Sequence, residues 1–400
     1  MIGIGSNDDI TLKLGTSTVS KAYWGTQQVY PNVTPPTPSG YETQYFTIEA
    51  TSAGTLYFDD NTTPFEYSLN NGSTWNTSTT TNTYNLGNGE KILFRCTNPS
   101  INSEQGIGHF YASDGQFKVY GNIMSLLYGS NFIGQMTFPY ADNSYVFSEL
   151  MYSFTTLTDA ENLVLPATTL ATHCYYQMFE SCTALETPPT VLPATTLAES
   201  CYSNMFHYCS SLTSAPALPA TTLASSCYGN MFNGCTSLTT APALPATTLA
   251  SRCYQQMFKE CTLLTSVPSV LPATTLALYC YNQMFYGCTS LTTAPALPAT
   301  TLRGSCYSNM FNGCTALTTA PVLPATTLTG NGCYVLMFNG CSNLNYIKAM
   351  FITTPGTTYT NKWVSGVAQS GTFVKNSAAQ WTTTGVNGVP NGWTVQTASE

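Results

Sequence analysis

Residues 227–249 read CYGNMFNGCTSLTTAPALPATTL, and this stretch is one unit of a regular repeat. The hexapeptide LPATTL occurs seven times at intervals of 26 or 27 residues, from the copy at Leu165 to the copy at Leu323. Each copy is followed by Cys-Tyr-x-x-Met-Phe-x-x-Cys and, three residues later, by leucine. A unit of this length cannot bury a core alone, whereas stacked units share one continuous core. The repeat therefore predicts a solenoid.

The prolines of one unit limit its extended part. Pro242 and Pro245 remove backbone donors, so we expect short strands with an incomplete ladder. The segment 250–258 has apolar residues at helical spacing, which predicts a short α- or 3₁₀-helix whose Met-Phe pair fills the core. Asn-Gly pairs such as Asn233-Gly234 are expected to end it in a left-handed conformation. The tyrosine of each unit is expected to cap the ridge and to hydrogen-bond through its hydroxyl.

Cysteine spacing adds a second regularity. Fourteen of the 15 cysteines form seven pairs spaced by eight residues, and Cys96 lies outside the repeats. In stacked units like cysteines form columns about 4.8 Å apart. Reduced thiols that act as small buried hydrophobic groups are the favoured interpretation. Disulfides between neighbouring units remain geometrically allowed, and zinc is disfavoured because structural sites place fewer residues between paired cysteines.

Charge composition restricts the partners. Only 8% of residues are charged, the net charge is −8 at pH 7, and the 11 lysines and arginines form no basic patch. Nucleic acids and anionic membrane surfaces bind basic patches, so neither is expected as a partner. No window approaches the roughly 18 apolar residues of a membrane-spanning helix, so no membrane insertion is expected. The first residues also lack the basic start and apolar run of a secretory signal.

Changes in composition along the chain predict its organisation. The fold class is mainly β with short helical segments, in which β modules precede the repeats and a C-terminal β cap follows them. Asn71-Gly72 predicts a hairpin in the second β module, and the slots of Leu150, Met151 and Phe154 predict a degenerate first unit. The predicted segments are an anchoring β module (1–30), a proline-rich linker (31–40), a β domain (41–120), an N-terminal cap with the degenerate repeat (121–164), the seven-turn array (165–345) and the β cap (346–400).

The repeat also resembles a known family. The block Met257-Phe258-Lys259-Glu260-Cys261-Thr262-Leu263-Leu264 is similar to leucine-rich repeats of the BspA type, and it recurs over about residues 145 to 345. The resemblance implies a right-handed solenoid of leucine-rich-repeat type with one short strand per turn. Members of that family are commonly surface or adhesion proteins. Methionine here replaces the usual alanine.

A second resemblance lies outside the repeats. The N-terminal segment ITLKLGTSTVSKAYWGTQQVYP, residues 10–31, is similar to the leader of structural and appendage proteins of phages that infect gut Bacteroidales. The combination of GNIMSLLYG, residues 121–129, with the repeats is similar to proteins of both those phages and their hosts. This resemblance implies a virion protein that is assembled in the host cytoplasm.

The sequence contains no catalytic constellation, so we expect no enzyme, cofactor or metal site. The three histidines are dispersed, and no phosphate loop or nucleophile elbow occurs. The positions that vary between otherwise copied units are the candidate ligand-binding residues, because aromatic and polar groups on an extended surface suit a glycan or a protein. A merely tolerant solvated face is the other interpretation. The candidates are His173, Glu180, Glu199, His207, Tyr208, Arg252, Lys259, Glu260, Tyr279, Tyr286 and Arg303.

Together these features favour a non-enzymatic virion protein, a tail or head fibre or appendage. Residues 1–30 would bind other virion proteins, and the array would recognise a host-surface glycan or protein. Oligomerisation, with a homotrimer as the expected state, would accompany that role. A bacterial cell-surface adhesin of BspA type and a purely structural decoration protein are the alternatives.

Overall fold

The structure, a computed structural model of the 400-residue chain, describes residues 13–14, 17–18, 22–24, 27–29, 40–59, 65–78, 81–96, 99, 106–139 and 144–398. The chain divides into two compact units, Met1–Thr37 and Pro38–Glu400. In the first unit β1 (Lys13–Leu14) pairs with β2 (Ser17–Thr18), and β3 (Ala22–Trp24) pairs with β4 (Gln27–Val29), both antiparallel. The predicted linker, apart from Gly40, lies outside the described residues.

The second unit begins with two β-sheets that face each other. One has the order β13-β12-β5-β10-β7-β8 and the other the order β11-β6-β9. Their facing sides meet through phenylalanines, and the rings of Phe46 on β5 and Phe110 on β11 lie 5.5 Å apart. The elements of this part are η1 (Tyr41–Thr43), β5 (Phe46–Ser52), β6 (Gly54–Asp59), β7 (Glu66–Ser68), β8 (Asn76–Thr77), β9 (Thr81–Leu86), β10 (Lys91–Arg95), β11 (His109–Ala112), β12 (Gln116–Asn122), α1 (Ser125–Tyr128), η2 (Gly129–Asn131), β13 (Leu157–Asp159) and β14 (Leu163–Val164).

The hairpin predicted at Asn71-Gly72 is confirmed. β7 and β8 pair in antiparallel register around it, and Asn71 and Gly72 both have positive φ, 57° and 82°. At the tip of the loop the N–H of Ser73 donates to the Asn70 carbonyl at 3.2 Å, and a β-turn with positive φ at both central residues is one that asparagine and glycine tolerate best. The side-chain carbonyl of Asn70 also accepts the backbone N–H of Thr74 at 2.9 Å, which closes the loop.

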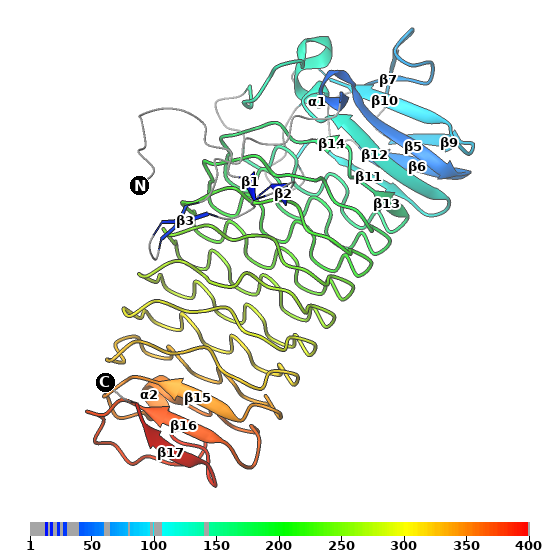
Figure 1. The fold of residues 1–400 in the computed structure, drawn as a ribbon. Helices are drawn as coiled ribbons and strands as arrows, with labels where there is room; N and C mark the ends of the chain where they lie inside the picture. Colours follow the sequence, from blue (N-terminus) through cyan, green and yellow to red (C-terminus); the bar gives the residue numbers. More distant parts are fainter. Residues whose placement is uncertain are drawn as a thin grey trace. The chain divides into compact units, whose positions relative to one another are not determined.

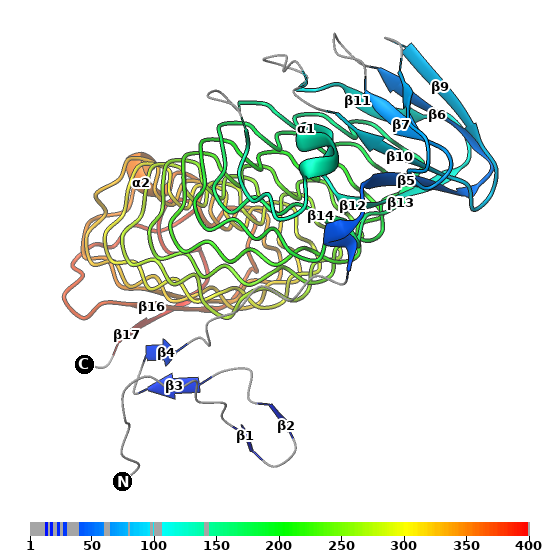
Figure 2. The ribbon, with the colours of Figure 1, turned by 90° about the horizontal axis from the view of Figure 1, so that it is seen from above.

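The larger sheet continues into the repeats. β12 is antiparallel to β5 on one side, and it is parallel to β13 and β14 on the other side. The chain then winds through stacked coils between this end and β15 to β17 (Figure 1), and the stack is seen from a second direction in Figure 2. One hydrophobic cluster runs without a break from Phe46 to Trp393. The β domain and the array therefore share one core.

Neighbouring coils are joined by backbone hydrogen bonds rather than by long strands. Extended contacts within residues 165–345 are isolated parallel bridges such as Thr222 to Thr248 and Thr240 to Ser266. The prolines explain the shortness, because they remove donors beside each bridge, as predicted for Pro242 and Pro245. The chain is accordingly mainly β with few helices.

The helix predicted over residues 250–258 is wrong. This segment is a run of turns in which every fourth residue has a positive φ, as at Arg252 and Gln256 (both 56°), and a right-handed helix excludes such residues. Its backbone N–H groups alternate between two kinds of partner. That of Gln255 donates within the turn to the Arg252 carbonyl (3.1 Å), and that of Gln256 donates to the Asn282 carbonyl of the next turn (2.9 Å). A helix would satisfy these N–H groups internally and would leave neighbouring turns without hydrogen bonds between them. We call this segment, and its counterpart in each of the other turns, a bend ribbon.

Left-handed residues recur at three places in each bend ribbon, namely the residue before the first cysteine and the third and seventh residues after it. The Asn-Gly pairs supply the last of these. Gly234 and Gly313 both have a φ of 77°, so the predicted left-handed glycines are confirmed. Other turns place Ser181, Tyr208 or Glu260 there, and each of those also has a positive φ.

The inward side chains form uniform columns. Successive tyrosine rings, from Tyr175 to Tyr334, stack 5.5 to 5.9 Å apart, and successive phenylalanine rings behind them stack 5.4 to 5.8 Å apart. The Met-Phe pairs are fully buried, which confirms their predicted role in the core. The prediction that the tyrosines cap the ridge is wrong, because Tyr228 is only 1% exposed. The rings instead stack on the same ring above and below. The predicted hydroxyl hydrogen bonds are missing at four of these residues, since the buried hydroxyls of Tyr175, Tyr202, Tyr281 and Tyr334 have no partner among the described residues.

The cysteines line the same core. All 15 are free and buried, which agrees with the reduced-thiol interpretation. The second thiol of each pair donates to a backbone carbonyl one turn back, as Cys235 does to Phe206 at 3.0 Å. Burial raises the pKa of the Cys253 thiol to about 12. These thiols are therefore structural groups with little thiolate character at neutral pH.

Stacking continues beyond the point where the sequence regularity ends. The N–H of Phe338 donates to Trp363 (2.8 Å), and the N–H of Gly340 donates to Ser365 (2.7 Å), in the pattern of the earlier turns. Trp363 thus occupies a methionine slot and is fully buried. The remaining elements are β15 (Tyr346–Ala349), α2 (Thr357–Thr360), β16 (Thr372–Lys375) and β17 (Thr394–Thr397), and the three strands form a parallel sheet.

Candidate functional site

The bend ribbons build a continuous outer face along the stack. Slots on one side of each ribbon hold the core columns, and the slots between them point away from the core. We define the outer face as the residues that lie one before, and two, three, six and seven after, the first cysteine of each pair. Because turns are hydrogen-bonded in register, residues in the same slot of neighbouring turns lie side by side. The outer face is therefore a set of short side-chain ladders.

The eleven predicted residues lie on this face or at its edge. Nine occupy outer-face slots, whereas Glu199 and Arg303 lie two and three residues before a first cysteine. Both of these edge residues are exposed. The structure brings the nine outer-face residues together as two clusters on different turns, with a polar stretch between them.

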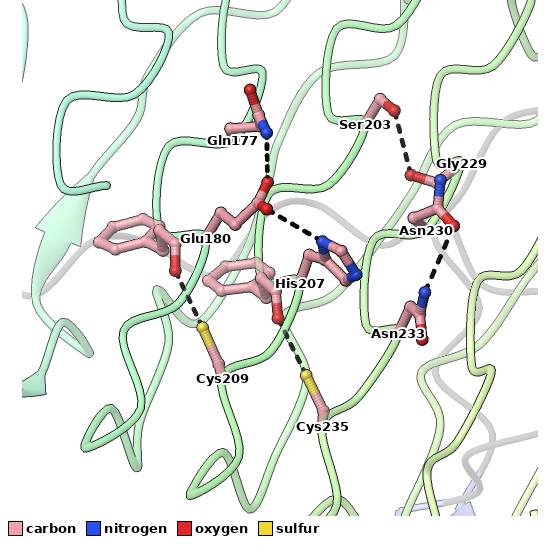
Figure 3. Close-up of polar contacts among 11 residues, drawn as sticks. Gln177, Glu180, Ser203, His207, Cys209, Gly229, Asn230, Asn233 and Cys235 are labelled. Carbon is pink, nitrogen blue, oxygen red and sulfur yellow. Dashed lines mark hydrogen bonds and ion pairs between the residues drawn. The ribbon is translucent and has the colours of Figure 1, made fainter. Parts of the chain in front are cut away.

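The first group, the histidine cluster, consists of His173, Gln177, Glu180, His207 and Tyr208. Figure 3 shows the Glu180 carboxylate between Gln177 of its own turn and His207 of the next. The Gln177 amide donates to it at 2.5 Å, and His207 Nδ1 lies 3.1 Å from it. The Tyr208 ring stacks on His207 at 4.0 Å and remains 50% exposed. These contacts fix the position of the Glu180 side chain, and the residue is only 8% exposed.

His173 lies at the start of the same cluster between aromatic rings. It stacks on Tyr145 with ring centroids 4.6 Å apart, and Tyr176 contacts it edge-on at 5.3 Å. Its Nδ1 is buried and has no hydrogen-bond partner among the residues that the structure describes. Burial lowers the pKa of His173, and the carboxylate of Glu199 opposes that shift. A neutral imidazole is the favoured form near neutral pH.

The second group, the cationic cluster, spans the turns of Cys253 and Cys280. It consists of three matched pairs, in each of which the second residue lies one turn beyond the first. The Arg252 guanidinium lies over the Tyr279 ring at 5.1 Å, and Lys259 Nζ lies over the Tyr286 ring at 5.6 Å. Between these pairs the Gln256 amide donates to Gln283 at 2.8 Å. Glu260 borders the cluster, 3.6 Å from Lys259.

The turn between the two clusters is polar and small. Figure 3 shows Ser203 donating to the Gly229 carbonyl (3.2 Å) and Asn233 close to Asn230 (3.5 Å). Gly234 leaves room for the Tyr208 ring, since a Cβ there would lie 2.4 Å from that ring. This turn separates the clusters without adding a charge of its own.

Sequence reasoning did not identify the glutamines. Gln177, Gln256 and Gln283 occupy the third slot after the first cysteine, where asparagine stands in three other turns. An amide at this position therefore looked the same from turn to turn, and only the structure shows that Gln177 donates to Glu180 and that Gln256 donates to Gln283. An amide recurring at one slot of a repeat was the available signal.

The described part of the chain offers little for other chemistry. No group of three or more His, Cys, Asp or Glu side chains within it is placed to hold a metal ion. Its helices are also too short and insufficiently apolar to cross a membrane. A polar hollow lies where β5 and β12 meet the first coil, and there Tyr120 donates to Glu49 (2.9 Å) beside the Lys118–Glu49 ion pair (3.0 Å).

No protein-family model matches the chain, and no curated protein matches it. Among solved structures the chain is similar to a leucine-rich repeat protein from Bacteroides ovatus, with 14% sequence identity. The match covers 73% of this chain and 96% of that chain, with a TM-score of 0.19. At that score the two backbones do not superpose as a whole, so the likeness supports no inference about function.

Proposed function

We propose that this chain is a non-enzymatic recognition protein whose repeat array binds a glycan or a protein on a cell surface. The supporting observation is the contrast between the two sides of the bend ribbon. The inward slots carry the same side chains in seven turns, while the outward slots gather charges and aromatic rings into two clusters. Stability does not require such clusters, because turns with serine, asparagine and glycine in those slots stack equally well.

We further propose that the chain acts as a virion appendage, with residues 1–30 bound to other virion proteins and a homotrimer as the working assembly. The leader-like sequence of residues 10–31 supports this setting. A BspA-like bacterial adhesin would use the same array on a cell envelope, and a decoration protein would leave the array unoccupied. Detection of the chain by mass spectrometry in purified particles supports the virion setting, whereas detection only in cell-envelope fractions replaces it with the adhesin.

The recognition proposal is tested with a variant, called the blank variant, in which all eleven candidate residues are replaced. Each of the eleven candidate residues is replaced by a residue that occupies the same slot in another turn, so the backbone is already known to accept it. The changes are Glu180→Asn, His207→Asn, Lys259→Asn, Tyr286→Asn, His173→Ser, Arg252→Ser, Tyr279→Ser, Glu199→Ser, Tyr208→Gly, Glu260→Gly and Arg303→Ala. A matched control changes exposed threonines of the LPATTL segments, Thr221→Ala and Thr247→Ala.

We expect the original chain and the threonine control to bind whole Bacteroidales cells or their extracted surface glycans, and the blank variant to lose that binding. Circular dichroism and the melting temperature should be alike for all three proteins. Equal binding by the blank variant would overturn recognition by the outer face. Binding by none of them would favour the decoration role.

A further inference from the structure

We propose that the cationic cluster is the binding site for an acidic polysaccharide, a chain of sugars that carries carboxylate or sulfate groups. This inference rests on the proposed recognition function and names its ligand class. It places the anionic groups on Arg252 and Lys259 and continues to Arg303. The histidine cluster has no part in it.

The charges of the array are segregated along its axis. Every lysine and arginine of residues 165–345 lies between Arg252 and Arg303, and three of the four carboxylates there precede Cys201. The fourth is Glu260, which lies beside Lys259. Since the chain has a net charge of −8, a local group of cations is not a by-product of a basic composition. It marks the part of the outer face that attracts an anion.

Neighbouring tyrosine rings position two of the cations. Arg252 lies over Tyr279, and Lys259 lies over Tyr286, in the same arrangement on the same two turns. Each ring attracts its cation through the negative face of the π-system and limits the conformations of the side chain. Among the described residues Arg252 has no carboxylate within ion-pair distance, so its guanidinium keeps its donors for a ligand.

The remaining groups suit a sugar. Gln256 and Gln283 lie between the two cation–tyrosine pairs, and their joined amides retain donor and acceptor capacity. Tyrosine rings supply flat apolar area beside polar tips, which is a common surface for sugar rings. The cluster therefore presents charge, amide and ring in one row across two turns.

An extended ligand fits the site better than a small anion. Arg303 lies at the rim of a shallow hollow with Thr301, Gly304, Gly330 and Asn331, one turn beyond the cluster. Gly330 approaches the backbone of Arg303 closely, since a Cβ on Gly330 would lie 2.3 Å from the Arg303 carbonyl. Cations on the turns of Cys253 and Cys306, with one uncharged turn between them, match the repeated charges of a polymer. Several weak contacts then act together.

The test compares three soluble polymers on the full-length chain. Alginate carries carboxylates, dextran sulfate carries sulfates, and dextran is uncharged. We expect the immobilised chain to bind one or both acidic polymers and to release them as the NaCl concentration is raised. It should not bind dextran. The double change Arg252→Ser and Lys259→Asn should weaken binding about tenfold or more, because two charge-assisted contacts are lost. Serine and asparagine occupy these slots in the turns of Cys227 and Cys306, so the change is compatible with the fold.

The matched control is Thr221→Ala with Thr247→Ala, which changes two exposed threonines outside the outer face. It should leave binding of the acidic polymer unchanged. Tyr279→Phe should keep binding, whereas Tyr279→Ser should weaken it about threefold, as expected for loss of one exposed cation–ring contact. Equal binding of dextran, or full binding by the Arg252/Lys259 double variant, would overturn the proposal.

The outcomes separate the two levels of inference. Cell binding that survives the Arg252→Ser and Lys259→Asn change and is lost in a Glu180→Asn and His207→Asn variant would keep the recognition function and overturn the acidic-polymer site. Cell binding that is indifferent to the whole blank variant would overturn both.

Discussion

The inward and outward sides of one bend ribbon differ in what a substitution would change. On the inward side, Phe232 lies between Phe206 and Phe258 at 5.6 Å on each side, so its neighbours are fixed by the repeat. On the outward side, Asn233 is followed by Lys259 at the same slot of the next turn without any change in the backbone ladder. Stability is thus spread over columns that every turn shares, and specificity can be confined to a few turns.

Alkaline pH should break this contrast most completely, because it acts on the tyrosine and cysteine columns of every turn at once. Burial raises the pKa of the core tyrosines and cysteines, and that of Cys306 reaches about 12. The folded chain therefore keeps protons that the unfolded chain releases, so stability is full below about pH 9 and falls as the pH rises toward 12. At pH 10, about one unit above the ordinary thiol pKa, each buried thiol should favour unfolding by roughly 1 kcal/mol. The combined effect of the fourteen thiols of the array should then be comparable with the ~5–15 kcal/mol stability of a typical domain.

The measurement is a pH titration followed by circular dichroism and tyrosinate absorbance. We expect the circular dichroism to be lost in one steep transition, together with a step in tyrosinate absorbance from the seven column tyrosines, which ionise only when the stack opens. Ionisation of all 26 tyrosines with unchanged circular dichroism would show that the columns are open to solvent.

Removing one ring tests the column at a single turn. Phe232→Ala should cost about 3–5 kcal/mol, since a fully buried ring is lost and its two stacking partners face a cavity. The control Thr221→Ala, an exposed residue of the same turn, should change stability by less than about 0.5 kcal/mol. Urea denaturation measures both, and hydrogen exchange should show lost protection centred on that turn and its neighbours. A similar small effect of both changes would mean that the rings do not carry the stability of the stack.

Much of this contrast could be predicted from the sequence, and the failures have one physical origin. The inward role of the Met-Phe pairs, the Asn71-Gly72 turn and the slots of the degenerate first unit follow from spacing, and Leu150, Met151 and Phe154 are fully buried. The bend ribbon did not follow from it. A helix and a ribbon with a left-handed residue at every fourth place both put residues such as Cys253, Met257 and Phe258 on one side. Glycine at every left-handed position would have indicated the ribbon rather than a helix, but most of these positions hold other residues.

The residues of the candidate site could be predicted from the sequence for a related reason. Positions that vary in a copied unit are the positions that the core does not constrain, so the eleven candidates lie on one face or at its edge. Their partners were not recoverable, because pairs such as Arg252 with Tyr279 depend on the register between turns. The turn that continues through Trp363 was overlooked for the opposite reason, since its backbone repeats while its sequence does not.

The smallest predicted changes in stability concern the left-handed position seven residues after the first cysteine, which holds different residues in different turns. Gly313→Ala should cost about 1 kcal/mol, because alanine is strained at a φ of 77° although its Cβ would meet nothing closer than 3.7 Å. Ser181→Gly, at the same slot of another turn with a φ of 62°, should stabilise the chain by up to about 0.5 kcal/mol, since relief of strain is partly offset by the greater freedom of glycine in the unfolded chain. Thermal denaturation of the two variants measures both signs against the unchanged protein. Opposite signs from one slot would place the strain in the backbone of the ribbon, whereas a neutral Gly313→Ala would be incompatible with the left-handed conformation there.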